Sequence, residues 1–267
     1  MRAGRWMLVA SALVACLWVL VPIYLLASNA LGGAETINAW PKTLVPRRLS
    51  LDTLVFFFGV EGVWQAVLNS VLVAVLTMLL AVGIGAPAGY ALARFAFPGK
   101  DLFRLAILLT RAFPIAILAL PLTVRFIEFG LYDTVWAVAL IHTALALPFA
   151  VLVTASLFMG IPRELEEAAW TLGCTRLQAF LKITWPLARP GIAATMIFAF
   201  VVSWNEVFAA AVLTLRERTL PAYLLISLNE SPLPFRFAGG LFLIVPALVF
   251  IFAVRRYLFA MWGIASR

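Results

Sequence analysis

The residues best able to do chemistry in this sequence are a few polar or aromatic side chains within long apolar stretches. A charged or amide group in apolar surroundings is costly, so each one is a candidate for a functional role. The candidate set comprises Asn69, Ser70, Arg111, Trp204, Asn205 and Glu206. Amide, hydroxyl and carboxylate groups can hydrogen-bond a hydroxylated solute, and an indole can stack on a sugar ring. The alternative is that these groups hydrogen-bond between helices and only hold the fold together.

Catalytic and metal-binding constellations are not expected. His142 is the one histidine of the sequence, and no second ligand lies near it, so we interpret it as structural. The cysteines Cys16 and Cys174 lie in unlike surroundings and do not indicate a disulfide framework. Since no cluster of histidines or carboxylates is present, an enzyme is the weakest of the functional alternatives.

Composition indicates which elements must position these groups. Of the 267 residues, 64% are hydrophobic and 12% are charged, whereas soluble domains carry about 25% charged residues. A helix that crosses a membrane needs about 20 apolar residues. The stretches that meet this requirement are 7–27, 66–93, 105–124, 134–158, 192–215 and 238–258. We therefore predict an all-α, polytopic membrane protein with about six transmembrane helices in a single domain, residues 1–267.

The ends of the chain and the loops predict an orientation. Arg2 and Arg5 precede the first stretch, which resembles a secretory signal but exceeds the usual apolar length of about 7–15 residues, so we expect a retained helix. Most of the 20 Lys and Arg residues fall in loops on the same side as the N-terminus, which predicts that both termini are cytoplasmic. The net charge of +8 thus indicates membrane orientation rather than nucleic-acid binding. Arg111 can face a transport path, pair with an acidic group or extend toward the headgroups.

The charged segment 161–190, which this orientation places in the cytoplasm, predicts a helix, a turn and a second helix. Pro162 and the acidic residues after it suit a helix N-terminus. Gly173 stands where a left-handed C-cap is needed, and Thr175 with Gln178 has capping-box spacing. One apolar stripe at helical spacing consists of Leu165, Ala168, Ala169 and Leu172.

The small side chains of this stripe allow another surface to approach closely. Ala168 and Ala169 add little bulk, and Glu167 beside them offers a charge to a basic partner. The alternative is an amphipathic hairpin on the lipid headgroups, which acidic residues disfavour because membrane lipids are often anionic. We therefore predict that this segment contacts another protein.

The same segment resembles the EAA loop of ABC importer permeases. The matching pattern is Glu167-Ala168-Ala169, three residues, Gly173, nine residues, Ile183, one residue, Trp185 and Pro186. Trp185 departs from the family pattern, which usually has leucine there. Other motifs that resemble the carbohydrate branch, and its maltose-type second permease in particular, are Asn69-Ser70, Pro87-Ala88-Gly89-Tyr90-Ala91, Gly130-Leu131-Tyr132-Asp133-Thr134 and Trp204-Asn205-Glu206.

This resemblance implies a type I ABC importer permease fold and uptake of a sugar or oligosaccharide by alternating access. It implies that a cytoplasmic ATPase docks on Glu167, Ala168, Ala169, Gly173, Ile183 and Pro186. The sequence lacks the Gly-x-x-x-x-Gly-Lys-Ser/Thr motif, so ATP and Mg are expected on that partner, and no cofactor is expected here.

The other implied partners are a second permease subunit, membrane lipid and an extracytoplasmic binding protein at the loop Arg216–Phe237. The implied location is a prokaryotic cytoplasmic (inner) membrane. The rival interpretations are a permease for a sugar phosphate, polyol, amino acid or peptide, and an ion-coupled secondary transporter that would use Glu206.

Overall fold

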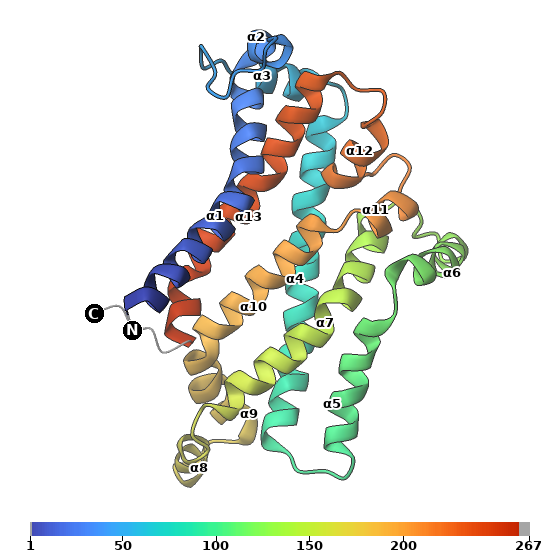
Figure 1. Ribbon diagram of the computed structural model, residues 1–267. Coiled ribbons are helices and arrows are strands. Elements are labelled where there is room, and N and C mark those ends of the chain that lie inside the picture. Colours follow the sequence, from blue (N-terminus) through green and yellow to red (C-terminus); the bar gives the residue numbers. More distant parts are fainter. Residues whose placement is uncertain (1, 262–267) are drawn as a thin grey trace. The chain divides into compact units, whose positions relative to one another are not determined.

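The structure is a computed structural model that describes residues 2–261, and helices are the regular elements within that range (Figure 1). In chain order these elements are α1 (Arg2–Leu31), α2 (Gly33–Asn38), α3 (Asp52–Gly59), α4 (Val63–Arg94), α5 (Lys100–Leu109), η1 (Thr110–Ala112), α6 (Ile115–Glu128), α7 (Val135–Met159), α8 (Glu164–Thr171), α9 (Arg176–Ala179), η2 (Phe180–Thr184), α10 (Trp185–Asn205), α11 (Phe208–Leu213), α12 (Leu220–Ser227) and α13 (Leu233–Met261).

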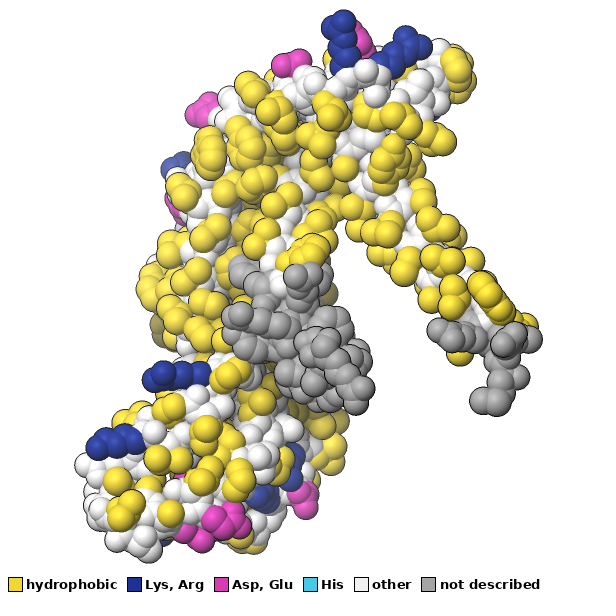
Figure 2. Space-filling model, turned by 90° about the vertical axis from the view of Figure 1, so that its left-hand side faces the viewer, with side chains coloured by type: hydrophobic (Ala, Val, Ile, Leu, Met, Phe, Trp, Pro, Cys, Tyr) yellow, Lys and Arg dark blue, Asp and Glu magenta, His cyan; other side chains and the backbone are white. Residues whose placement is uncertain are grey.

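Long apolar helices dominate the described residues. The four that are long and apolar enough to cross a membrane are Trp6–Leu31, Val63–Arg94, Val135–Met159 and Arg176–Asn205. A fifth candidate is the pair α5–η1 and α6, which is bent by 87°, and α13 contributes a shorter apolar part, Leu233–Val249. On the face shown in Figure 2, hydrophobic side chains cover the lengths of the helices and charged ones gather toward the ends. All six predicted stretches overlap these elements, but the stretches 105–124 and 192–215 each cross a break in the helix.

The predicted span 105–124 is not one continuous helix. The chain leaves the helical conformation at Phe113 and Pro114, whose ψ angles are 118° and 128°. Proline lacks an N–H donor and restricts the residue before it to extended backbone, which explains the break at this point. As a result Arg111 lies in η1 beside the break, rather than inside an uninterrupted span.

The predicted span 192–215 is shifted toward the N-terminus. One helix of 30 residues runs from Arg176 to Asn205 through α9, η2 and α10. The N–H of Trp185 donates to the carbonyl of Phe180, an i to i−5 bond that marks η2 as a π turn. The helix stops at Glu206, where the backbone becomes extended (ψ 128°). The second helix of the charged segment is therefore continuous with a membrane span.

Contacts within the chain group it into two compact units. One comprises residues 1–64 and 224–246, and the other comprises 65–223 and 247–267. The first unit has an aromatic core around the buried Phe57, whose ring centroid lies 5.2 Å from that of Phe58 and 5.1 Å from that of Phe235. Phe242 adds a third ring at 6.4 Å.

In the second unit, close contact between α4 and α7 depends on two small residues of α4. A Cβ atom at Gly89 would lie 2.1 Å from Thr154 Oγ1 and 2.7 Å from the backbone nitrogen of Ala155. The Thr154 hydroxyl donates to the carbonyl of Gly85 at 3.0 Å. Glycines four residues apart share one helix face and let backbones approach closely. Since α7 also packs on α10, these three helices form the frame that carries the charged segment.

Candidate functional site

The α8–α9 hairpin, residues 164–179, has the shape that its capping residues predict. Gly173 is left-handed (φ 85°), and its N–H donates to the carbonyl of Trp170 at 3.0 Å. The N–H of Cys174 donates to the carbonyl of Ala169, which completes a Schellman motif at the end of α8. Thr175 and Gln178 form a capping box at the start of α9. The predicted helix, turn and helix are thus confirmed.

One side of the hairpin faces outward with small and apolar residues. Glu167, Ala168 and Gly173 are exposed, and Leu172 is 85% exposed. Ala169, by contrast, is buried, so the predicted stripe splits between two faces. Ile183 in η2 and Pro186 in α10 are partly buried beyond the hairpin. These two candidates are therefore less accessible than Glu167, Ala168 and Gly173.

Glu167 lies on the exposed side and pairs only locally. Its carboxylate lies 3.1 Å from Nε of Arg163, one turn earlier, and both side chains are about half exposed. Exposed pairs of this kind contribute little to stability because water and salt screen them. Glu167 can therefore exchange Arg163 for a basic group on a partner at small cost.

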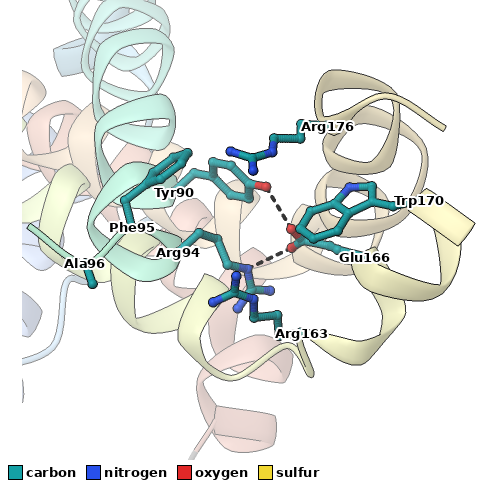
Figure 3. Close-up of a pocket in the computed structure, with 8 residues that line it drawn as sticks. All are labelled: Tyr90, Arg94, Phe95, Ala96, Arg163, Glu166, Trp170 and Arg176. Carbon is teal, nitrogen blue, oxygen red and sulfur yellow. Dashed lines mark hydrogen bonds and ion pairs between the residues drawn. The ribbon is translucent and has the colours of Figure 1, made fainter.

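The neighbouring Glu166 is buried and joins the hairpin to the helical frame. Its carboxylate accepts hydrogen bonds from Tyr90 Oη at 2.7 Å and Arg94 Nε at 2.8 Å (Figure 3). It also accepts one from Thr184 Oγ1 at 2.6 Å. Arg94 also donates to the carbonyl of Ile161 at 3.0 Å. Burial alone would raise the pKa of Glu166, but these hydrogen bonds and the Arg94 charge outweigh it and lower the pKa.

Sequence reasoning missed Glu166 because three acidic residues in one helical turn all suit the helix dipole. The face that turns inward depends on the frame, which a single helix does not reveal. A signal was nevertheless present, since Tyr90 and Arg94 lie one turn apart at the end of an apolar helix. Two donors on one face of a helix can share a single acceptor.

Asn69 and Ser70, two transport-path candidates, hold a loop in the second unit. The Asn69 amide donates to Glu217 Oε2 at 3.0 Å and to the carbonyl of Arg218 at 3.3 Å. Ser70 Oγ accepts from the N–H of Leu220 at 2.7 Å. Both side chains are buried, so the arrangement supports the interpretation that they stabilise the fold.

Glu206 also has a structural environment, at the break between α10 and α11. Its carboxylate accepts from the N–H groups of Ala209 and Ala210, at 3.0 and 3.3 Å, and so caps the start of α11. The same carboxylate lies 3.0 Å from Nε2 of His142, whose Nδ1 lies 2.8 Å from Ser203 Oγ. His142 is fully buried, in keeping with the structural role expected for it.

The remaining candidates differ in their access to open space. Arg111 is exposed and lines a cavity of about 250 Å³ together with Thr110, Ala144, Leu145, Pro148 and Val202. Asn205 is exposed, although its amide donates back to the carbonyl of Val201 at 2.8 Å. Trp204 is 2% exposed and stacks on Phe200, with ring centroids 6.0 Å apart. Arg111 and Asn205 are thus the exposed members of the candidate set, and Arg111 also lines a cavity.

Residues 81–260 match the model of a family described as the binding-protein-dependent transport system inner membrane component. The chain belongs to this family. It is accordingly a multi-pass inner-membrane permease of a transport system, and its exposed hairpin lies within the matched region. Membership also removes the ground for interpreting the chain as a secondary transporter or an enzyme.

Among similar proteins, the trehalose transport system permease protein SugB of Mycobacterium tuberculosis is 32% identical over 265 residues, which cover 97% of this chain and 95% of that protein. The fold is similar to that of a bacterial ABC transporter involved in the import of the acidic polysaccharide alginate. The TM-score is 0.75 at 22% identity, over 96% of this chain and 98% of the other. A second structure of a bacterial alginate transporter, in complex with an alginate pentasaccharide-bound periplasmic protein, gives a TM-score of 0.68 at 19% identity, over 94% and 93%. This similarity establishes the type I importer permease fold.

Proposed function

We propose that this chain is one permease subunit of an ABC importer for a sugar or oligosaccharide. The observation that carries the proposal is the α8–α9 hairpin, which exposes Glu167, Ala168 and the Gly173 turn while Glu166 fixes its other side. The trehalose permease that resembles this chain along nearly its full length supports a carbohydrate substrate. The rival substrates are a sugar phosphate, a polyol, an amino acid or a peptide.

In this proposal the hairpin receives force from a cytoplasmic ATPase dimer, which binds ATP and Mg. Glu167 contacts a basic group of the ATPase, and Ala168 permits close approach. Because one helix runs from Arg176 to Asn205, movement of the hairpin displaces the span without an intervening joint. Glu166 passes the same movement to α4 through Tyr90 and Arg94.

The other parts of the assembly follow from this orientation. Both termini and the hairpin lie in the cytoplasm, a second permease subunit completes the path, and an extracytoplasmic binding protein delivers solute near Arg216–Phe237. The fixed geometry of that region supports the last role, since the N–H groups of Leu215, Arg216 and Glu217 all donate to Asp133. Arg111, at the break beside α6, is the residue we assign to the solute path.

Uptake by the assembled importer tests the docking role. We expect Glu167→Lys and Gly173→Pro each to abolish uptake and ATPase stimulation while the subunit still reaches the membrane. Leu177→Ala, which changes an exposed residue of α9, serves as a hairpin control. Normal uptake by both variants would refute the proposal.

The substrate is tested by purifying the importer with its binding protein. The rate of ATP hydrolysis is then measured with each class of solute in turn: disaccharides, oligosaccharides, polyols, sugar phosphates and amino acids. We expect stimulation by an uncharged sugar. Stimulation by an amino acid alone would contradict the sugar assignment but leave the permease assignment intact.

A further inference from the structure

A second cavity, of about 270 Å³, lies where the hairpin meets the end of α4 (Figure 3). Its lining residues are Tyr90, Arg94, Phe95, Ala96, Arg163, Glu166, Trp170 and Arg176. Three guanidinium groups thus face one carboxylate, which leaves an excess of positive charge. In Figure 3 the guanidinium groups of Arg163 and Arg176 lie on opposite sides of the hydrogen bond between Tyr90 and Glu166.

The cavity holds more hydrogen-bond donors than acceptors. Both oxygens of Glu166 already accept hydrogen bonds, from Tyr90 and from Arg94 with Thr184. Trp170 Nε1 is buried and has no acceptor among the residues that the structure describes. The Arg176 guanidinium lies over the Trp170 ring, 5.7 Å from its centroid. An anion with several oxygens could accept from Trp170 Nε1, which has no acceptor within residues 2–261, and could pair with Arg176.

Arg176 of the hairpin and Arg163, the residue just before α8, are available for such an anion. Arg163 pairs with Glu167, but that pair is about half exposed and readily exchanged. When Glu167 engages another partner, Arg163 is released toward the cavity. Arginine presents a fork of donors that matches the oxygens of a phosphate group. A phosphate group in the cavity would therefore find complementary charge and donors at Arg163 or Arg176.

The surroundings of the cavity indicate where the phosphate comes from. Arg94 is the last residue of the apolar helix α4, so the cavity lies at the end of a membrane-spanning helix. Phe95, which lines it, is 46% exposed, and the nearby Phe97 is 41% exposed. Aromatic residues are enriched at membrane interfaces, and basic pockets between helices on the cytoplasmic side bind anionic headgroups. An apolar rim beside a basic cavity suits a ligand with both a phosphate and a hydrocarbon tail.

We propose that this cavity binds the phosphate group of an anionic phospholipid. The inference relies on the proposed orientation only for the choice of leaflet, and it is independent of the sugar assignment. A headgroup that contacts Arg94 together with Arg163 or Arg176 would link the end of α4 to the hairpin, in addition to the hydrogen bonds of Glu166. Anionic lipid would then stabilise the hairpin in its docked orientation.

Lipid binding to the purified full-length chain in detergent tests this directly. Native mass spectrometry would measure binding of phosphatidylglycerol, phosphatidylcholine and inorganic phosphate. We expect phosphatidylglycerol to bind at least tenfold more tightly than either of the others. The double variant Arg163→Gln, Arg176→Gln is expected to lose that preference, and the Lys double variant to retain part of it. Arg189→Gln is the matched control, because Arg189 is an exposed arginine of α10 that is absent from the cavity lining.

Three results would overturn the proposal. One is equal binding of phosphatidylglycerol by the wild type and the Gln double variant. Another is binding of inorganic phosphate as tight as that of the lipid, which would identify free phosphate as the ligand. The third is loss of ATPase assembly in the Gln double variant without any change in lipid binding, which would identify an acidic protein segment as the occupant. Because lipid binding is measured without transport, failure here leaves the permease assignment untouched.

Discussion

Two carboxylates of the second unit, Glu166 and Asp133, each fix an irregular segment, but they do so with different donors. Glu166 accepts from three side chains that belong to α4 and η2. Asp133 accepts from three consecutive backbone N–H groups of the loop after α11, at 2.7, 2.9 and 3.1 Å. Side-chain donors link whole helices, whereas backbone donors fix the path of one loop. Glu166 therefore suits a hairpin that transmits movement to other helices, whereas Asp133 suits a loop that keeps its shape.

The largest expected effect comes from removing the buried carboxylate. Glu166→Ala leaves Arg94, whose side chain is 9% exposed, without its carboxylate partner, and breaking a buried pair costs up to about 3–5 kcal/mol. We expect a marked fall in thermal stability and loss of uptake, measured on the purified importer. Glu167→Ala, one residue away and exposed, should abolish ATPase coupling with less than about 0.5 kcal/mol change in stability. Similar destabilisation by both variants would contradict the distinction between anchor and contact.

The loop carboxylate should have a smaller and more local effect. Asp133→Ala leaves three N–H groups without their acceptor, and we expect a cost of about 1–3 kcal/mol. Hydrogen exchange should accelerate at Leu215, Arg216 and Glu217 while the hairpin remains protected. Asp133→Asn keeps one acceptor oxygen and provides the matched control. Faster exchange in the hairpin would show that the two attachments are not independent.

Acid should weaken the attachment of the hairpin to the helical frame. The pKa of Glu166 in the folded protein lies below its ordinary value of 4.5. Its contribution to stability is therefore fully present above about pH 4.5 and is lost as the pH falls through the lowered value. Burial alone would raise the pKa of Asp133, but three N–H donors and the Arg216 charge lower it. The contribution of Asp133 to stability is therefore also lost as the pH falls. Thermal unfolding against pH should be flatter in Glu166→Gln, and an unchanged slope would contradict this assignment.

The smallest expected effect concerns the capping box. Thr175→Ala removes the side-chain acceptor at the start of α9 and should cost about 1 kcal/mol. Thr175→Ser keeps the oxygen and should restore stability. Uptake should fall only slightly in Thr175→Ala, since the Schellman turn at Gly173 remains. Complete loss of uptake would mean that α9 itself positions the contact surface.

Local features of the site were predictable and its inward face was not. Gly173, Thr175 and Gln178 specify caps through interactions within a few residues, so the sequence alone predicts them. Glu166 needs Tyr90, which lies 76 residues earlier in the chain. No periodicity within one helix reveals such a partner.

The fold shows the same limit. Hydropathy located every long helix but merged the break at Pro114 into one span, because Phe113 and its neighbours are apolar throughout. It also separated the charged residues of α9 from α10, although hydrogen bonding continues through η2. Sequence alone could not separate structural residues from solute-contacting ones among the transport-path candidates, because it does not show their partners. Asn69 and Glu206 have the polarity of a solute site, but their partners lie in the protein.

The π turn η2 accommodates one extra residue between the hairpin and its span. A π turn holds one residue more than an α-helical turn over the same full rotation. Deleting Lys182, which is exposed within η2, would therefore convert η2 into an α-helical turn and leave the direction of the hairpin nearly unchanged. Deleting a residue from the regular helix α10 would instead rotate the hairpin by about 100° about the helix axis. The contact surface thus tolerates a change of residue count at η2 that it would not tolerate a few residues later.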